Sequence, residues 1–357
     1  MTDATESVDK VIDRDALASY LDTHLEGDGP LSVERHQEGH SNETVFVDWG
    51  DREFVLRRPP LGATEDSAHD VLREHRVMSA LQDTDVPVPP AVLACEDESV
   101  IGSEFFLTER LEGDVIREEE PTRFRSVDAR EQITDELIDT LIAIHEIDPD
   151  AVGLGDFGDP STYLERQVGV WRQQLEEWLL PKTAEKRELP HVEEIGAWLS
   201  ENIPEEADHG LVHGDFKLDN VMYGPGTPPE LVGVLDWEMS TLGDPLADVG
   251  WLLTFWRDED DPDYGVPEEL GVSVTTRAGY PTRAELLETY EQRTGREFVN
   301  RRFYRTLNEY KITVACEAMY LRYISGDADD PMYPALEEGV PALARRTKAV
   351  YDGELVP

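Results

Sequence analysis

The chain has 357 residues, of which 39% are hydrophobic, so it can bury a sizeable core, and its length suits two packed lobes or domains. Its 78 acidic and 32 basic residues give a formal net charge of -46, and only six of the basic residues are Lys. A field of this sign repels nucleic acid and anionic membranes, so we expect neither as a partner.

The N-terminal segment and the cysteines bear on location. Residues 1–10 are acidic and lack the apolar run of a signal peptide, and no uncharged apolar run approaches the roughly 20 residues that a membrane span needs. Cys95 and Cys316 are the only cysteines in the sequence, which argues against a zinc cluster or a disulfide framework. We therefore expect a soluble, cytoplasmic protein with two buried thiols.

The first third of the chain is predicted to form a small antiparallel sheet. Apolar residues alternate there in short runs bounded by turn residues, and the predicted strands are residues 32–37, 44–49, 53–57, 91–95 and 104–111. Apolar residues at helical spacing predict a helix at residues 14–25 and a second at residues 65–81, which is expected to pack on the sheet. The second helix is expected to stop at the PVPP segment.

From about residue 112 the pattern becomes mainly helical. The predicted helices are residues 129–145, 162–180, 192–200, 244–257, 282–293, 301–324 and 334–351, and a loop rich in Pro, Asp and Gly occupies 258–271. We place a boundary at residues 111–113, so that 1–111 form an N-terminal lobe and 112–357 a C-terminal lobe. The predicted fold class is α+β, with a small sheet lobe and a larger helical lobe.

Two acids and an amide stand at the ends of two short apolar runs. Asp215 and Asn220 belong to the stretch LVHGDFKLDN, and Asp236 follows LVGVL and opens DWE. Two short strands there would bring the three side chains into one cleft. Asn220 and Asp236 then suit Mg²⁺, which takes few protein oxygens and completes its shell with substrate phosphates, whereas Asp215 is free to accept a hydroxyl proton. Phosphoryl transfer requires this division of roles.

The phosphates of a nucleotide need a second site, because the chain has no G-x-x-x-x-G-K-[ST] loop. The stretch EGHSNET between two predicted strands offers one: Gly39 allows close backbone approach, and Ser41, Asn42 and Thr44 supply hydroxyl or amide donors. In FVLRR, Arg57 would pair with phosphates while Glu74 on the following helix holds it in place. The ordinary alternatives are a polar hairpin turn and a solvated surface arginine.

Other residues also have two readings. Turn capping explains single Asp and Asn residues after strands, and Asp244 before a proline is expected to cap a helix. His209 and His213 have the spacing of zinc-binding helical histidines, but glycines interrupt a helix there. One predicted helix carries four side chains that either line an acceptor pocket or fill the core: Tyr163, Arg166, Trp171 and Trp178. For the two tryptophans we favour the core.

Together these stretches resemble the aminoglycoside phosphotransferase family of small-molecule kinases, whose fold is like that of protein kinases. HGDFKLDN is similar to its catalytic loop, LDWE to its metal-binding segment, EGHSNET to its nucleotide-binding loop and FFLTERLEG to the hinge between its lobes. The resemblance implies a protein-kinase-like two-lobe fold and adenine binding by the hinge backbone from Glu109 to Leu111. It also implies that Asp248 and His213 steady the catalytic loop. Arg57 departs from the common pattern, which has Lys there.

Three further stretches resemble the subgroup of kinase domains that are fused to acyl-CoA dehydrogenases in animals: IHEIDPDAVGLGDFG, YLERQVGVWRQQLEEW and VACEAMYLRYISGD. The resemblance implies Mg²⁺-dependent transfer of the γ-phosphate of ATP or GTP to a hydroxyl of a small molecule, and the subgroup suggests a hydroxyacyl-CoA. An aminoglycoside- or choline-type acceptor is an alternative, and so is a catalytically silent nucleotide-binding scaffold. The sequence leaves the acceptor, the nucleotide base and the oligomeric state open.

The acidic, lysine-poor composition resembles that of proteins from salt-loving microbes and predicts that the fold depends on salt. At molar salt the Debye length is about 3 Å, so the self-repulsion of the chain is largely screened. We expect structure to be lost when salt is removed, as measured by circular dichroism. An unchanged spectrum in dilute buffer would contradict this expectation.

Overall fold

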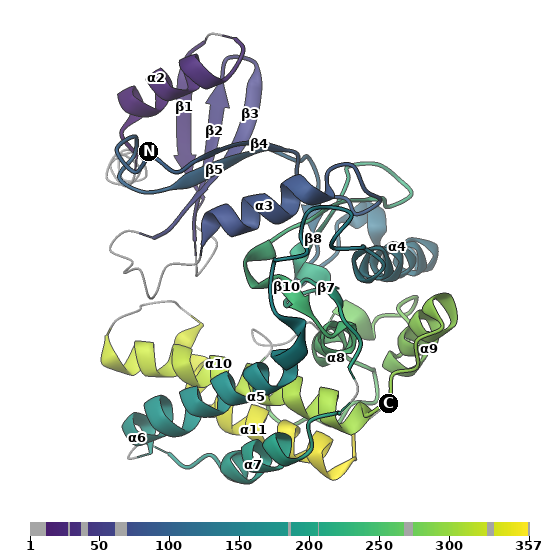
Figure 1. Cartoon of the computed structure of the whole chain (residues 1–357). Coiled ribbons are helices and arrows are strands. Elements are labelled where there is room, and N and C mark those ends of the chain that lie inside the picture. The colour runs from purple at the N-terminus through teal and green to yellow at the C-terminus, as the bar shows by residue number, and fades with distance from the viewer. Residues whose placement is uncertain are drawn as a thin grey trace. The chain divides into compact units, whose positions relative to one another are not determined.

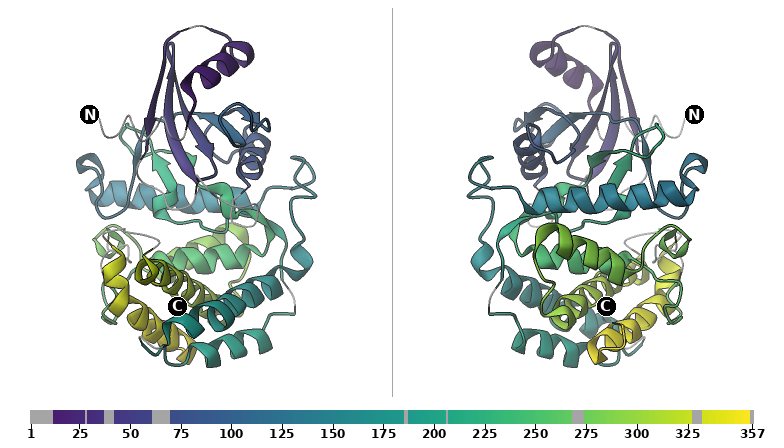
Figure 2. Two further views of the ribbon diagram at one scale, coloured as in Figure 1. Left: turned by 90° about the vertical axis from the view of Figure 1, so that its left-hand side faces the viewer. Right: turned by 90° about the vertical axis from the view of Figure 1, so that its right-hand side faces the viewer.

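The computed structural model of the chain describes residues 12–27, 29–36, 42–60, 70–184, 187–205, 207–267, 274–326 and 332–355 (Figure 1, Figure 2). Contacts divide the chain into two units. Unit 1 comprises Met1–Asp114, Met222–Pro225 and Leu231–Ser240, and unit 2 comprises Val115–Val221, Gly226–Glu230 and Thr241–Pro357. None of the described helices combines the length and apolarity that crossing a membrane requires. Both cysteines are buried, as predicted.

A five-stranded antiparallel sheet of order β1-β2-β3-β5-β4 forms the frame of unit 1. Its strands are β1 (Leu31–Arg35), β2 (Glu43–Trp49), β3 (Arg52–Arg58), β4 (Ala91–Cys95) and β5 (Phe105–Glu109). The five predicted strands are confirmed, with small differences at their ends. The register places Arg57 between Thr44 on β2 and Phe106 on β5.

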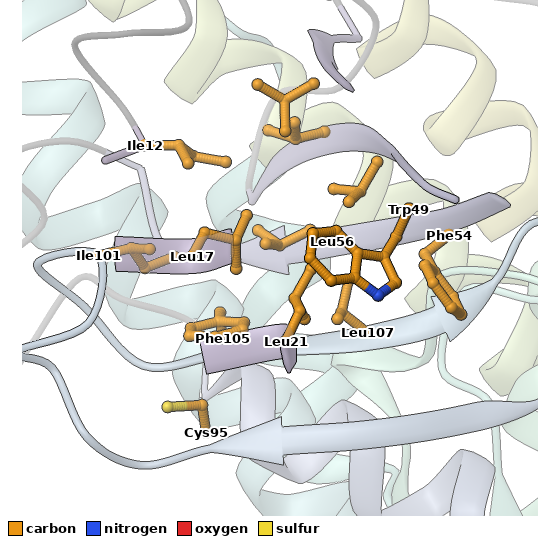
Figure 3. Packing of buried hydrophobic residues seen from close by; sticks show 13 residues of the cluster. Ile12, Leu17, Leu21, Trp49, Phe54, Leu56, Cys95, Ile101, Phe105 and Leu107 are labelled. Atoms are coloured by element: carbon orange, nitrogen blue, oxygen red, sulfur yellow. The ribbon is translucent and has the colours of Figure 1, made fainter. Parts of the chain in front are cut away.

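Helices α2 (Arg14–His24) and α3 (Val71–Leu81) pack on opposite faces of this sheet. One face joins α2 in the buried apolar cluster of Figure 3, whose members include Ile12, Leu17, Leu21, Trp49, Phe54, Leu56, Cys95, Ile101, Phe105 and Leu107. Because successive strand residues alternate between faces, Arg57 and Phe106 lie on the other face. There the Phe106 ring centroid is 5.8 Å from that of His75 on α3. Arg57 is thus directed to the side of the sheet that carries α3.

Helix α3 begins at Val71, and the prediction of a helix running from residue 65 through this point is wrong. Asp70 has extended backbone angles, and its side chain accepts a hydrogen bond from the Arg73 amide at 2.9 Å. Asp70 is therefore the N-cap, a position that Asp favours. Glu65 and Asp66 are also acidic and fit the first turn of a helix equally well, so the sequence did not distinguish Asp70 as the N-cap. Residues 61–69 lie outside the described residues.

A small sheet of order β6-β8-β9 carries the segment that precedes Asp236. Its strands are β6 (Asp114–Val115), β8 (Val221–Tyr223) and β9 (Leu231–Val234). Within unit 1, the Val234 amide donates to the Pro87 carbonyl at 2.8 Å. Leu111 fills the space beside Gly233, where a Cβ would lie 2.3 Å from the Leu111 side chain. These contacts fix where β9 ends and therefore where Asp236 begins its turn.

Unit 2 is mainly helical, and the helices predicted for it are present. They are α4 (Val127–His145), α5 (Tyr163–Gln173), α6 (Leu180–Thr183), α7 (Val192–Glu201), α8 (Pro245–Phe255), α9 (Arg283–Thr294), α10 (Arg301–Ser325) and α11 (Leu336–Asp352). Helix α8 is buried along nearly its whole length and packs on α10, which also lies beside α11 (Figure 2). The α+β fold class is confirmed.

The helix predicted over residues 162–180 is interrupted in the structure. Helix α5 ends at Gln173, a π-helical turn η3 (Gln174–Leu179) follows, and α6 begins at Leu180. The physical reason is Pro181, which has no amide hydrogen and whose ring crowds the carbonyl four residues earlier. A regular α-helix cannot run through that position, and the wider π-helical turn accommodates it.

A two-stranded ribbon of β7 (Gly210–Val212) and β10 (Thr241–Gly243) leads into α8. Asp244 caps α8, as predicted, by accepting a hydrogen bond from the Leu246 amide at 3.0 Å. The Tyr163 ring lies against Gly243, where a Cβ would be 2.8 Å from it. The ribbon therefore fixes both the start of α8 and the start of the loop that follows β7.

A buried ion network joins α10 and α11 in unit 2. Glu309 on α10 accepts a hydrogen bond from Arg346 Nε at 2.7 Å and lies 3.6 Å from Arg305. Arg283 pairs with Asp261 beside this network. Burial lowers the pKa of Arg305 to about 10, against the attraction of Glu309. Such a network stabilises the fold only while each buried cation keeps its carboxylate.

Glu309→Gln should therefore destabilise the protein by about 3–5 kcal/mol, because it leaves two buried guanidiniums without their carboxylate. The measurement is the free energy of unfolding from urea titrations at constant salt. Asp352→Asn is the matched control, since its pair with Lys348 on α11 is partly exposed and should contribute less than about 1 kcal/mol. Equal effects of the two substitutions would contradict the prediction.

Candidate active site

The loop 213–220 follows β7 and begins with a tight turn. Gly214 has φ +85°, a conformation that residues with side chains rarely adopt. His213 is buried, and its Nδ1 accepts a hydrogen bond from the Asp215 amide at 3.2 Å. A short 3-10 turn, η4 (Leu218–Asn220), ends the loop. The turn thus places Asp215 and Asn220 at the two ends of one compact loop.

Asp248 on α8 holds the start of this loop. Its carboxylate accepts hydrogen bonds from the His213 amide at 2.7 Å and from the Gly214 amide at 2.9 Å. Burial alone would raise the pKa of Asp248, but the hydrogen bond with His145 and the nearby His213 bring this pKa below its ordinary value. The steadying contact that the family resemblance implies for Asp248 is therefore present in the structure.

Three donors surround the Asp215 carboxylate. Trp251 Nε1 donates to Oδ1 at 2.6 Å, Asn220 Nδ2 donates to Oδ2 at 2.7 Å, and Lys217 Nζ lies 3.3 Å from Oδ2. Burial opposes the charge of Lys217, but Asp215 and Asp219 raise its pKa overall, so it stays cationic. Among the described residues, this carboxylate caps no helix or turn amide. Its geometry is that of a side chain oriented by other side chains.

The side-chain nitrogen of Asn220 donates both to the backbone carbonyl of Asp215, at 2.8 Å, and to the Asp215 carboxylate. Because the nitrogen is committed there, the carbonyl oxygen of the amide is the atom left for a cation. The structure brings together two of the three residues on which the prediction depends, Asp215 and Asn220. Asp236 belongs to unit 1, so its convergence with them stays a prediction.

In unit 1, Arg57 lies among three carboxylates. Its Nη2 is 3.5 Å from Glu74, 3.2 Å from Asp236 and 3.9 Å from Glu238. Its Nη1 is 3.5 Å from Thr44 Oγ1. Only 18% of the Arg57 side chain is exposed, so it is not the solvated surface arginine of the ordinary alternative. The pairing with Glu74 that the sequence suggested is present.

Three carboxylates around one guanidinium leave this cluster with excess negative charge. Burial raises the pKa of Glu74 to about 7 in spite of Arg57, and Asp236 and Glu238 add to this effect. Burial works against the charge of Arg57, but the same three acids raise its pKa overall. The cluster is therefore short of positive charge, and a further cation would stabilise it.

Asp236 adopts a backbone conformation that is rare for a residue with a side chain. Its φ of 64° and ψ of 59° lie in the left-handed region, at a cost of roughly 1–2 kcal/mol. The next residue anchors the turn: Trp237 is fully buried, and its Nε1 donates to the Val234 carbonyl at 3.0 Å. Strain of this kind is common at functional sites, where the surrounding structure holds it.

The other predicted nucleotide-binding residues fall only partly within the described chain. Gly39 and Ser41 lie outside the described residues. Asn42 is buried, its Nδ2 is 3.4 Å from Glu238 Oε2, and its Oδ1 has no hydrogen-bond partner among the described residues. The Glu109 amide donates to the Pro90 carbonyl, just before β4, at 2.8 Å, and Leu111 packs beside β9. Their roles toward a nucleotide stay predictions.

The donors present fit a hard divalent cation. Among the described residues, no group of three or more His, Cys, Asp and Glu side chains is arranged to hold a metal ion by itself. Unit 1 offers carboxylate oxygens with unbalanced charge, and unit 2 offers the amide oxygen of Asn220. A small number of oxygen donors suits Mg²⁺, because phosphates and water complete its shell.

Three residues of the candidate site were not predicted from the sequence: Lys217, Glu238 and Trp251. The first two lie within stretches that were already singled out, HGDFKLDN and LDWE. Trp251 stands three residues after Asp248, so both lie on one face of α8. The spacing of Asp248 and Trp251 is visible in the sequence, but it indicates a site residue only when Asp248 is known to bind the loop 213–220.

The four side chains of the predicted helix 162–180 have different surroundings. Tyr163 is buried, and Trp171 is partly buried. Trp178 is 60% exposed, so the prediction that it fills the core is wrong. It lies on the π-helical turn, which shifts the helix face that later residues occupy. Arg166 is exposed and donates hydrogen bonds to Thr162 Oγ1 and to the Asp159 carbonyl, both of which precede α5.

Solved structures identify the class of this fold. A protein of Ralstonia eutropha JMP134 assigned to the aminoglycoside phosphotransferases is 33% identical with a TM-score of 0.73, over 94% of this chain and 99% of that one. The GDP complex of aminoglycoside 2'-phosphotransferase-IIIa is 15% identical with a TM-score of 0.63, over 94% and 99%, which shows a shared fold alone. The fold is that of the kinase-like phosphotransferases, as predicted.

The family follows from the sequence matches. Residues 32–304 match the model of the phosphotransferase enzyme family, and the chain belongs to that family. It is 34% identical over 326 residues to acyl-CoA dehydrogenase family member 10 of Mus musculus, covering 89% of this chain and 29% of that protein. It is 32% identical over 353 residues to member 11 of Rattus norvegicus, covering 93% and 43%. The chain thus spans less than half the length of these relatives.

The titration of Glu74 predicts a pH-dependent stability. Its pKa is raised from 4.5 to about 7, so the folded protein keeps a proton that the unfolded chain releases. The stabilisation from this proton is complete below pH 4.5 and is lost as the pH rises through 7, to the extent of roughly 3 kcal/mol.

Glu74→Gln should flatten the dependence of the unfolding free energy on pH between 5 and 8, measured at fixed salt with a chelator present. Glu34→Gln, at an exposed position of β1, should keep the wild-type slope. A Glu74→Gln slope equal to that of wild type would contradict the assignment.

Proposed function

We propose that this chain is a small-molecule kinase that transfers the γ-phosphate of ATP or GTP to a hydroxyl group. The observation that carries the proposal is the Asp215 carboxylate, which Trp251, Asn220 and Lys217 orient and which caps no described helix or turn. Membership of the phosphotransferase family supports the reaction class.

In the proposed mechanism Asp215 is the base. The acceptor hydroxyl gives its proton to Asp215 while its oxygen bonds to the γ-phosphorus, and the bond from that phosphorus to the β-phosphate oxygen breaks, so that the nucleoside diphosphate leaves with the electron pair. Trp251 and Asn220 each donate to a different oxygen of the carboxylate, which fixes its orientation. Lys217 offsets negative charge beside Asp215.

We assign Asn220 and Asp236 as the Mg²⁺ ligands, which leaves Asp215 unligated. A bound Mg²⁺ would neutralise charge on the transferring phosphate. Two observations support cation binding by Asp236 and Asn220. Negative charge is in excess around Arg57, which Asp236 contacts, and the amide oxygen of Asn220 is left over because its amide nitrogen bonds Asp215. Each residue presents an oxygen donor within its own unit.

For the nucleotide, we assign phosphate contacts to Arg57, which Glu74 holds, and to the loop that contains Gly39, Ser41 and Asn42. We assign the base to the backbone between Glu109 and Leu111. The ion pair with Glu74 supports the first assignment, because it holds the Arg57 guanidinium in a fixed position. The others rest on the family resemblance.

The acceptor we favour is a hydroxyacyl thioester such as a hydroxyacyl-CoA. The relatives named as acyl-CoA dehydrogenase family members support it, since this chain matches a part of each of them. An aminoglycoside- or choline-type acceptor remains the alternative. We further propose that the acceptor is the main partner, that neither nucleic acid nor membrane is bound, and that the protein acts in the cytoplasm.

A catalytically silent scaffold of the same fold is the alternative from a different class. Such a protein would tolerate loss of the base or of a metal ligand. Here Asp215, Asn220 and Asp236 are all retained, and Asp236 keeps a strained backbone that a scaffold would have no reason to preserve. These observations favour an enzyme.

Asp215→Asn should lower turnover by about 10²- to 10⁴-fold, because it removes the base, yet leave nucleotide binding intact. Asp236→Asn should instead weaken the Mg²⁺-dependent rise in melting temperature that ATP or GTP produces. The assay is label transfer from γ-labelled nucleotide, at high salt, to a panel of hydroxyacyl-CoAs, choline, sugars and aminoglycosides. Asp208→Asn, on the surface of unit 2, is the control and should behave as wild type. Label on no acceptor, together with no nucleotide-induced shift, would overturn the kinase proposal.

A further inference from the structure

Lys311 on α10 is a lysine whose charge the fold does not explain. It is 5% exposed, and among the described residues no carboxylate forms an ion pair with its ammonium. Its Nζ lies instead 4.6 Å from the ring centroid of Trp251 and 5.9 Å from that of Trp171. In a chain with only six lysines, this one occupies the interior of unit 2.

Keeping an ammonium at this place destabilises the fold. Burial lowers the pKa of Lys311 to about 8, although Asp248 and Asp215 act in the opposite direction. The indole faces attract the cation, but they replace only part of its lost hydration. Met would fill the same helical position without a buried charge. Packing alone therefore gives no reason for lysine here.

Trp251 connects Lys311 to the proposed base. The edge of its indole donates to Asp215 Oδ1 at 2.6 Å, and its face contacts the Lys311 ammonium. The ammonium and the carboxylate thus touch the same side chain, and both belong to unit 2. Because one indole touches both groups, Lys311 belongs to the immediate surroundings of the proposed base.

A role as counterion for the nearby acids does not account for Lys311. Asp248 already accepts two backbone amides and interacts with His145. Asp215 already has Trp251, Asn220 and Lys217 as donors. Both carboxylates are satisfied within hydrogen-bonding distance, so neither needs a further, more distant cation. The ammonium has three donors, and within the described parts of the chain no oxygen accepts a hydrogen bond from it.

We infer that Lys311 binds an acyl oxygen of the acceptor, either a carboxylate or a thioester carbonyl, that lies a few atoms from the hydroxyl facing Asp215. This inference rests on the proposed kinase function and narrows its acceptor to hydroxyacyl compounds. An ammonium pairs with oxygen acceptors, and a charge-assisted hydrogen bond in a water-poor site is strong. A polycationic amine would meet Lys311 and Lys217 together and be repelled, which disfavours an aminoglycoside.

The test compares acceptors that differ by one oxygen. Wild type should phosphorylate a hydroxyacyl-CoA, or the free hydroxy acid, about 10- to 150-fold more efficiently in kcat/KM than the matching S-(hydroxyalkyl)-CoA thioether, which lacks the carbonyl. Preference for the thioester identifies the oxygen as its carbonyl, and preference for the free acid identifies it as a carboxylate. Lys311→Met should abolish the preference, mainly through KM, and Lys311→Arg should restore part of it. Lys182→Met, at an exposed lysine of α6, should keep the wild-type ratio.

Stability separates this role from a structural one. Lys311→Met should melt at the wild-type temperature or higher, since it removes a buried charge, whereas a structural lysine would lower the melting temperature when replaced. An unchanged thioester-to-thioether ratio in Lys311→Met would overturn the inference while leaving the kinase proposal intact. Absence of transfer to any acceptor by wild type would instead count against the proposed function itself.

Discussion

The hydrogen bonds from the His213 and Gly214 amides to Asp248 are the constraint on which the site of unit 2 depends. Because Gly214 turns with a positive φ, the chain leaves β7 with two consecutive amides that the strand cannot satisfy. A buried carboxylate is a strong acceptor for both. Helix α8, which carries Asp248, also carries Trp251 on the same face, and Trp251 binds Asp215. One helix therefore sets both the path of the loop and the orientation of its carboxylate.

Positive charge is scarce in this chain, and its placement follows the candidate sites. With 78 acids and 32 basic residues, most cations would find a partner anywhere on the surface. Yet Arg57 is held inside unit 1 among more carboxylates than it can neutralise, and Lys217 and Lys311 lie near Asp215 in unit 2. Burying these cations has a free-energy cost that surface positions avoid. Their positions are thus more informative than the net charge, which reports mainly on salt and solubility.

Local patterns predicted most elements, and single residues explain where they did not. The sheet and the long helices have clear apolar periodicity, so their existence was readable, but Asp70 stops α3 and Pro181 interrupts α5 in spite of it. Asp215, Asn220 and Asp236 stand in contiguous stretches and could be found from sequence. Lys311 could not, because its neighbours are set by the packing of α10 on α8. That packing is close at Gly250, where a Cβ would lie 2.6 Å from Asn308, and no local pattern encodes it.

Arginine at position 57 changes how charge is held in unit 1. A lysine ammonium is a point charge, whereas a guanidinium has separate nitrogens in a planar fork. Here Nη1 reaches Thr44 on β2 while Nη2 lies among Glu74 on α3, Asp236 and Glu238, so one side chain ties the sheet, the helix and the turn after β9 together. A lysine at this position of β3 would keep the positive charge but lose the contact that Nη1 makes with Thr44. Since excess negative charge remains around the guanidinium, arginine at position 57 is compatible with the Mg²⁺ site that we propose at Asp236, and its several contacts add rigidity to the residues around it.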